Sequence, residues 1–196
     1  MIGGAGYFAC VTLHENLAPG KYKLTVDDYL HLDETGVFGP HRTELLDGDI
    51  IVMNAEYRPH GWARDELAYR LRRALELLGS DLTATSGSVH ASGHDMPMPD
   101  ITLTREPRGQ GAIPLASVAL VVEISSTTLR RDTADKVAIY AHAGIAEYWV
   151  VDVNARVIHQ MWNVAGDTYA SRHDVAFGDP IEASTIPGLK VETSDL

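Results

Sequence analysis

Apolar residues recur along the chain either at three- and four-residue steps, which predict helices, or in short β-prone runs, which predict strands. The two patterns alternate. Leucines at three- and four-residue steps predict a helix over 61–79, which Gly79 ends. A second helix is predicted over 21–32, with Thr25 able to cap its start. A third is predicted over 132–143, with Asp132 as N-cap and Asp135 three residues later, as in a capping box.

Runs of β-prone residues between these helices predict strands. The most specific signal is Asp47-Gly48 inside 43–53, because this dipeptide favours the tight turn of a β-hairpin. Further strands are predicted over 82–91, 96–103, 118–125, 147–152 and 156–162, with shorter ones over 168–176 and 181–191, and 105–114 is expected to be a loop. The predicted fold class is α/β (α+β), a central mixed sheet flanked by helices, with β-hairpins at both ends.

The strand beginning at Val118 is apolar enough to be buried on both faces, yet Glu123 lies inside it. The two-residue period places Glu123 on one face with Val121 and Ser125, and Val122 on the other. A buried carboxylate needs a counter-charge, a proton or a metal. On this residue alone, a structural ion pair and a ligand role are both open.

Composition limits the class of protein. The chain has 196 residues, 45% apolar and 22% charged, as in a single globular domain. Its one cysteine, Cys10, excludes an internal disulfide and agrees with a cytoplasmic location, and no apolar run is long enough to cross a membrane. Residues 1–20 carry neither a signal peptide pattern nor a clear element, so we interpret them as an N-terminal extension and 21–196 as one domain.

The net charge of −11 argues against general, high-affinity coating of nucleic acid. A local basic patch would still permit binding, and arginines on the 61–79 helix supply the best one. Acids gathered around a metal would themselves make the charge more negative.

Four residues form the candidate site. Glu44 lies on the first hairpin strand, Asp100 follows Pro99 at a strand start, Glu123 lies on the next strand, and Lys136 on the helix after it. Asp100 and Glu123 are separated by 23 positions, enough for a strand, a loop and a return, so their carboxylates can meet at one sheet end. Two carboxylates that close repel each other unless a cation or a proton lies between them. Among cations Mg²⁺ suits such oxygen ligands, with Mn²⁺ as an alternative.

Each of these residues also has a plain structural interpretation. Glu44 and Lys136 would then face solvent. His60, just before the predicted helix, could contact a substrate or be an incidental loop residue. His90 and His94, beside Asp95, would share a face only on a helix, which the small residues around Gly93 disfavour, so we do not expect them to bind metal.

The order of these residues resembles the PD-(D/E)XK nuclease superfamily, in particular its "Uma two" branch of restriction endonucleases, long treated as a domain of unknown function. The matching stretches are YKLTVDDYLHL, TELLDGDIIVMN, Arg58-Pro59-His60, MPDITL, LVVEISS with RRDTADKVAIYAHAGIAEYWVVD, and VIHQMW. They cover nearly everything from Lys21 onward. The resemblance implies a restriction-endonuclease-like fold and metal-dependent hydrolysis of nucleic-acid phosphodiesters, with DNA as the expected partner.

Carried over by residue, the resemblance implies that Asp100 and Glu123 are metal ligands, that Glu44 is a further ligand, and that all three act in catalysis with Lys136. The chain departs from the superfamily pattern at Ser125, where the general motif has its lysine. Lys136, with Tyr140 one helical turn away, is the expected replacement.

Two other functions remain open at this point. One is a catalytically inactive binding or assembly module of the same fold, which the acidic charge favours. The other is a metal hydrolase acting on a small phosphoester. We also consider a homodimer as an assembly state.

Overall fold

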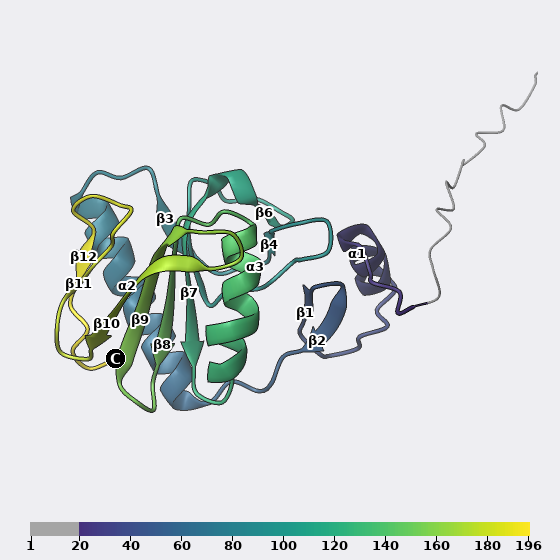
Figure 1. Ribbon diagram of the computed structural model, residues 1–196, viewed down its shortest axis with the longest axis horizontal. Coiled ribbons are helices and arrows are strands. Elements are labelled where there is room, and N and C mark those ends of the chain that lie inside the picture. Colours follow the sequence, from purple (N-terminus) through teal and green to yellow (C-terminus); the bar gives the residue numbers. More distant parts are fainter. Residues whose placement is uncertain (1–19) are drawn as a thin grey trace, which may run out of the picture.

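A six-stranded mixed sheet forms the centre of the protein, seen in a computed structural model that describes residues 20–196 (Figure 1). The strands lie in the order β10-β9-β8-β7-β5-β3, and only β7 and β8 run parallel. Their bounds are β3 Thr83–Thr85, β5 Ile101–Thr104, β7 Val118–Ser125, β8 Glu147–Asp152, β9 Val157–Val164 and β10 Tyr169–Ala176. The mixed central sheet predicted from the sequence is therefore confirmed.

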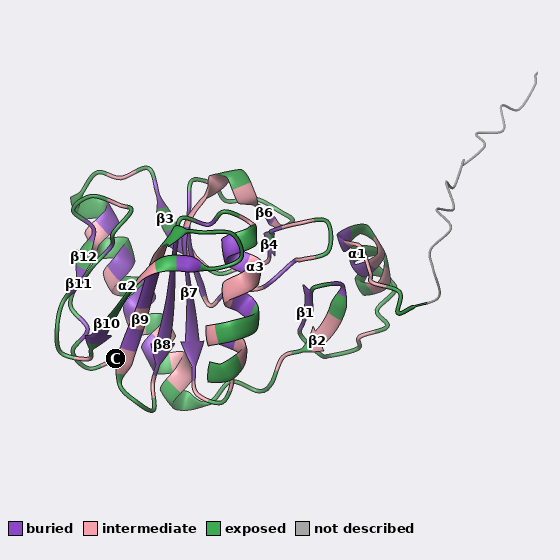
Figure 2. Ribbon diagram, in the orientation of Figure 1, coloured by how far each residue is buried: buried purple, intermediate pink, exposed green. Residues whose placement is uncertain are grey.

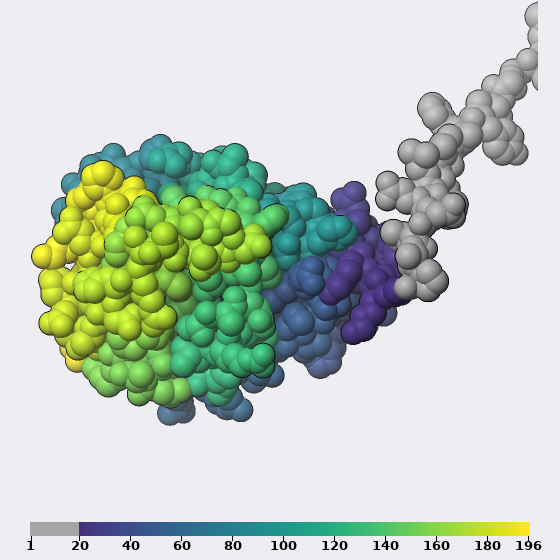
Figure 3. Space-filling view, viewed as in Figure 1, coloured from purple at the N-terminus to yellow at the C-terminus, as the bar shows by residue number. Residues whose placement is uncertain are grey.

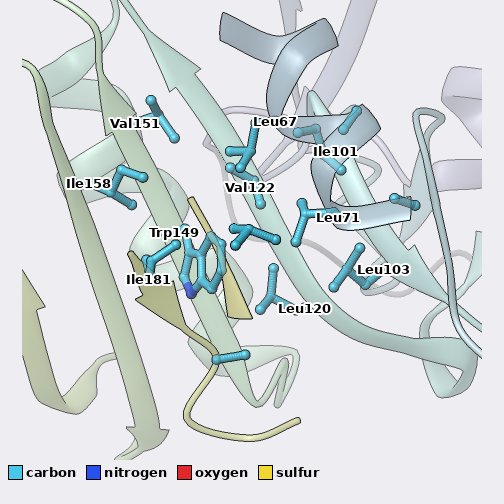
Figure 4. Close-up of a cluster of buried hydrophobic side chains, with 14 of the residues drawn as sticks. Leu67, Leu71, Ile101, Leu103, Leu120, Val122, Trp149, Val151, Ile158 and Ile181 are labelled. Carbon is cyan, nitrogen blue, oxygen red and sulfur yellow. The ribbon is translucent and has the colours of Figure 1, made fainter. Parts of the chain in front are cut away.

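Helices cover the two faces of this sheet (Figure 1). The long helix α2 (Arg58–Leu77) packs its leucines against Leu120 and Val122 of β7, in a core that also holds Trp149 (Figure 4). The short helix α3 (Lys136–His142) packs Tyr140 and Ala141 on the other face, which includes Val121. The predicted division of β7 between two faces is thus confirmed, and Figure 2 shows the central strands buried throughout much of their length.

A smaller unit lies at one end of the molecule (Figure 3). It contains α1 (Val26–Glu34) and a hairpin of β1 (Thr43–Leu46) and β2 (Asp49–Val52). Thr25 and Asp28 form the capping box of α1, and Asp47 and Gly48 both have positive φ, 49° and 68°, as a type I′ hairpin turn requires. A small apolar cluster, which includes buried Val26 and Tyr29, joins α1 to the hairpin.

The predicted strand over 82–91 is wrong as one element. It divides into β3 and a two-residue β4 (Val89–His90), and β4 pairs with β6 (Ile113–Pro114) from the predicted loop. The Ser86-Gly87-Ser88 interruption, which carries no large apolar side chain, separates the two pairings. A 3₁₀ turn (Leu115–Ser117) then leads into β7, and the C-terminal segment forms β11 (Ile181–Glu182) and β12 (Lys190–Val191).

Asp132 is not the N-cap of the third helix. Helical structure already begins at residue 129, and Arg131–Asp135 forms a π-helical turn directly before α3. Asp132 is buried and its carboxylate accepts a hydrogen bond from the Thr128 hydroxyl. A widened turn of this kind often marks a functional position in a helix.

Two sequence expectations concern the ends and the environment of the chain. The proposed N-terminal extension, apart from residue 20, lies outside the described residues. Across the described part, no helix combines the length and the apolar character that a membrane crossing would require.

Candidate active site

Asp100 and Glu123 come from neighbouring antiparallel strands at the same end of the sheet. Ile101 of β5 pairs with Val122 of β7, so Asp100, just before β5, lies beside the last residues of β7. The backbone N–H of Ile124 donates to Asp100 Oδ2 at 2.8 Å. The expectation that strand, loop and return would bring the two acids together is met.

Glu123 is anchored through one of its two oxygens. Lys136 Nζ donates to Glu123 Oε1 at 2.8 Å and Tyr140 Oη donates to the same atom at 2.6 Å. Both donors lie on one side of α3 because they are four residues apart. These contacts leave Oε2 available to a ligand.

Glu44 reaches the same lysine from the hairpin. Its Oε2 lies 3.0 Å from Lys136 Nζ and accepts a hydrogen bond from the Met98 N–H at 3.2 Å. Glu44 is 0% exposed and Lys136 2% exposed, so the solvent-facing interpretation of both is wrong. Glu44 Oε1 is buried without a hydrogen-bond partner among the described residues.

A small cavity of about 80 Å³ opens at this end of the sheet. Asp100, Glu123 and Lys136 line it, whereas Glu44 lies behind the lysine and does not. The remaining lining comes from the hairpin exit, the first turns of α2, the turn after β7 and the π-helical turn, and consists of Arg42, Met53, Asn54, Ala55, Glu56, Tyr57, His60, Arg64, Ile124, Ser126, Thr127, Thr128, Arg131 and Asp132.

The structure brings His60 and Asp132 to this site. The sequence left His60 open as a substrate contact or an incidental loop residue, and Asp132 was expected only as a helix cap. His60 lies in the first turn of α2, and its Nε2 is 3.3 Å from Asp100 Oδ2 while Nδ1 is 3.2 Å from Glu56 Oε1. Pro59 was an available signal, since proline favours the first turn of a helix and could have placed His60 on one. His90 and His94 do not line this cavity, and His94 Nδ1 lies 2.8 Å from the Leu24 carbonyl oxygen.

Burial and excess negative charge govern the protonation of this cluster. Burial raises the pKa of Glu123 to about 8, against the opposing effect of Lys136, and the charges of Asp100, Asp132 and Glu44 raise it further. Burial also raises the pKa of Asp132, while the Thr128 hydrogen bond opposes this. The site therefore holds more acid than its single buried lysine can neutralise.

Neighbouring acids raise the pKa values of two basic residues of the cluster, Lys136 and His60. Burial lowers the pKa of Lys136, but Glu123 and Glu44 outweigh burial and leave it above its ordinary value. Burial likewise lowers the pKa of His60, and Asp100 and Glu56 together raise it above the ordinary value. Lys136 is consequently a fixed positive charge between two carboxylates.

The oxygens left free fit a hard divalent cation. The described contacts of Asp100 end on Oδ2 and those of Glu123 end on Oε1, so Oδ1 and Oε2 are available. No three His, Cys, Asp or Glu side chains within residues 20–196 gather closely enough to enclose a metal by themselves. Mg²⁺ does not need such a cage, because it keeps several waters and uses one or two carboxylates.

Comparisons with known proteins bear on the fold and on the family of this chain. A putative nuclease belonging to DUF820 from Anabaena variabilis ATCC 29413 has a similar fold, with a TM-score of 0.59 and 16% identity over 82% of this chain and 89% of that chain. No curated protein matches the sequence. The family model described as Uma2, putative restriction endonuclease, matches residues 26–194, and the chain belongs to that family.

Proposed function

We propose that this protein is a metal-dependent endonuclease that hydrolyses phosphodiester bonds, with DNA as the substrate and Mg²⁺ or Mn²⁺ as the cofactor. The observation that carries the proposal is the meeting of Asp100, Glu123 and Lys136 at one small cavity. Family membership supports the nuclease chemistry.

Asp100 and Glu123 hold the metal in this proposal. The Ile124 N–H and His60 fix Asp100 through Oδ2, and Lys136 and Tyr140 fix Glu123 through Oε1. Each carboxylate is thereby oriented with one free oxygen. When bound, Mg²⁺ would supply a water of lowered pKa and positive charge for the reacting phosphate.

Lys136 provides a permanent positive charge at the cavity wall, where negative charge develops on the attacked phosphate. Glu44 has two candidate roles. The resemblance implies that it is a further metal ligand, while its 3.0 Å contact with Lys136 supports a role in positioning that lysine, which we favour.

Arginines can receive the phosphate itself. Arg42, Arg64 and Arg131 line the same cavity, and the Nε of Arg131 also lies 4.0 Å from Asp132 Oδ1. Guanidinium groups form charge-assisted hydrogen bonds with phosphate oxygens, so these arginines are the candidate phosphate contacts.

The test is cleavage of plasmid and oligonucleotide DNA by purified protein with Mg²⁺ or Mn²⁺. Asp100→Asn and Glu123→Gln should each lower the cleavage rate by at least about 100-fold, because each removes a ligand charge. Asp167→Asn is the matched control, since its carboxylate lies on an exposed pair with His142. Full activity in either site variant would refute the assignment.

A further inference from the structure

Tyr57 is an exposed aromatic residue on the wall of the cavity that holds Asp100 and Glu123. Tyr57 is 69% exposed, and it lines the cavity together with both acids. Among the described residues it takes part in no side-chain hydrogen bond and no aromatic pair, so most of this ring is left to solvent. An aromatic ring left in water beside a reaction centre is available to a ligand.

The backbone holds Tyr57 in place. It is the N-cap of α2, with φ −98° and ψ 159°, and its carbonyl accepts the hydrogen bond of the Gly61 N–H at 3.1 Å. Pro59 follows in the first turn of the helix. Tyr57 therefore lies at the start of a 20-residue helix that packs on the sheet.

The cavity is small, about 80 Å³, and Glu123 on its wall is mostly buried. A phosphate of an unpaired strand can enter such a recess more readily than a phosphate of a rigid duplex, because an unpaired strand can bend at that point.

The charges around the cavity favour the same conclusion. Duplex binding without sequence preference rests on phosphate contacts from Lys and Arg, whereas three arginines line this recess and the chain carries a net charge of −11. Binding of one unpaired strand can instead combine a few phosphate contacts with stacking of a base on an aromatic ring. The base faces needed for stacking are covered in a duplex and open in a single strand.

We propose that the substrate of this site is an unpaired DNA strand, either single-stranded or in a gap or flap, with a base stacked on Tyr57 while the neighbouring phosphate enters the cavity. The inference rests on the proposed nuclease function and adds the structural class of the substrate. Tyr57 acts in binding and positions the strand.

Binding is tested without divalent metal, in EDTA, by fluorescence anisotropy of a labelled mixed-sequence DNA oligonucleotide. The probes are the single strand, its blunt duplex and the same duplex with a short unpaired gap. Wild-type protein should bind the single strand and the gapped duplex at least about tenfold more tightly than the blunt duplex. Equal or tighter binding of the blunt duplex, or no binding of any probe, would overturn the proposal.

Variants of Tyr57 test the stacking contact. Tyr57→Ala should weaken single-strand binding by about 5- to 150-fold, while Tyr57→Phe, which keeps the ring, should bind like wild type. Tyr69→Ala is the control, because Tyr69 is 57% exposed on the same helix but does not line the cavity. Equal effects of Tyr57→Ala and Tyr69→Ala would show that the contact is absent.

Cleavage of the same probes with Mg²⁺ or Mn²⁺ separates this inference from the proposed function. Tyr57-dependent strand binding without cleavage would refute hydrolysis and retain the strand site. Cleavage that needs Asp100 but prefers the blunt duplex would retain the nuclease and refute the strand site.

Discussion

Lys136 is the one buried lysine in the described part of the chain, and two acids from separate elements contact its ammonium group. Glu44 comes from the hairpin and Glu123 from the central strand, so the lysine links the two units of the fold. A buried ion pair contributes little net stability compared with an apolar substitute, but breaking it is expensive because an uncompensated charge remains.

Lys136→Met should lower the free energy of unfolding by about 3–5 kcal/mol, because Glu44 and Glu123 lose their counter-charge. Urea unfolding measures the change. Adding Glu44→Gln to the variant should recover part of the loss, while Lys190→Met, on an exposed position of β12, should change stability by less than about 0.5 kcal/mol. A loss below about 1 kcal/mol for Lys136→Met would contradict this account.

Glu123 gives a pH dependence with a definite sign. Burial raises its pKa from 4.5 to about 8, so the folded protein binds more protons than the unfolded chain between these values. Its contribution to stability is complete below pH 4.5 and is lost as the pH rises toward 8.

The measurement is the difference in unfolding free energy between wild type and Glu123→Gln, in EDTA, from pH 5 to pH 9. Glutamine resembles the protonated acid, so this difference should become less favourable to wild type as the pH rises, by at most about 1.4 kcal/mol per unit. A flat or opposite dependence would show that Glu123 does not hold its proton in the folded state.

Local elements follow the sequence where short-range chemistry decides them. The Thr25 cap, the Asp47-Gly48 turn and the leucine period of α2 were all predicted from the sequence, and all are present. The π-helical turn and the division of 82–91 could not be predicted from the sequence, because both depend on hydrogen bonds with distant or shifted backbone partners. The Ile113 pairing with Val89 is an example.

The hairpin turn offers a prediction at this scale. A Cβ on Gly48 would lie 2.7 Å from Lys23 Cβ, at a φ of +68°. Gly48→Ala should therefore destabilise the protein by at least about 1 kcal/mol more than Gly39→Ala, where φ is +58° but no atom lies within 4 Å. Thermal unfolding compares the two, and equal losses would mean that backbone strain alone accounts for the effect.

At the scale of the whole molecule, buried carboxylates connect parts that are distant in sequence. Glu147, at the start of β8, is fully buried and accepts hydrogen bonds from Trp149, Gln160, Ser184 and Thr185. It ties the segment between β11 and β12 to the sheet. The strand around Glu147 was predicted from the sequence. Its hydrogen-bond partners could not be predicted, since residues about 37 positions away supply two of them.

Metal binding also acts on the whole molecule, and it separates the proposed nuclease from an inactive module of the same fold. A ligand that binds only the folded state at about 100 times its Kd adds about 2.7 kcal/mol of stability, roughly 5–10 °C in Tm for a chain of this size. Mg²⁺ should raise the Tm of wild type and of Asp167→Asn, but not that of Asp100→Asn. An unchanged Tm at millimolar Mg²⁺ and Mn²⁺ would favour the inactive module.

The sequence by itself determined the mixed sheet and the order of most elements, because period and turn chemistry are local properties of the chain. The order of motifs along the chain also nominated the four residues of the candidate site. Tertiary structure decided what these residues do to one another. It placed Glu44 behind Lys136 at 0% exposure, brought His60 to Asp100, and added buried Asp132 to the cavity. Those contacts join segments from the hairpin, α2, the central strands and the helix after β7, and no local pattern encodes the distance between them.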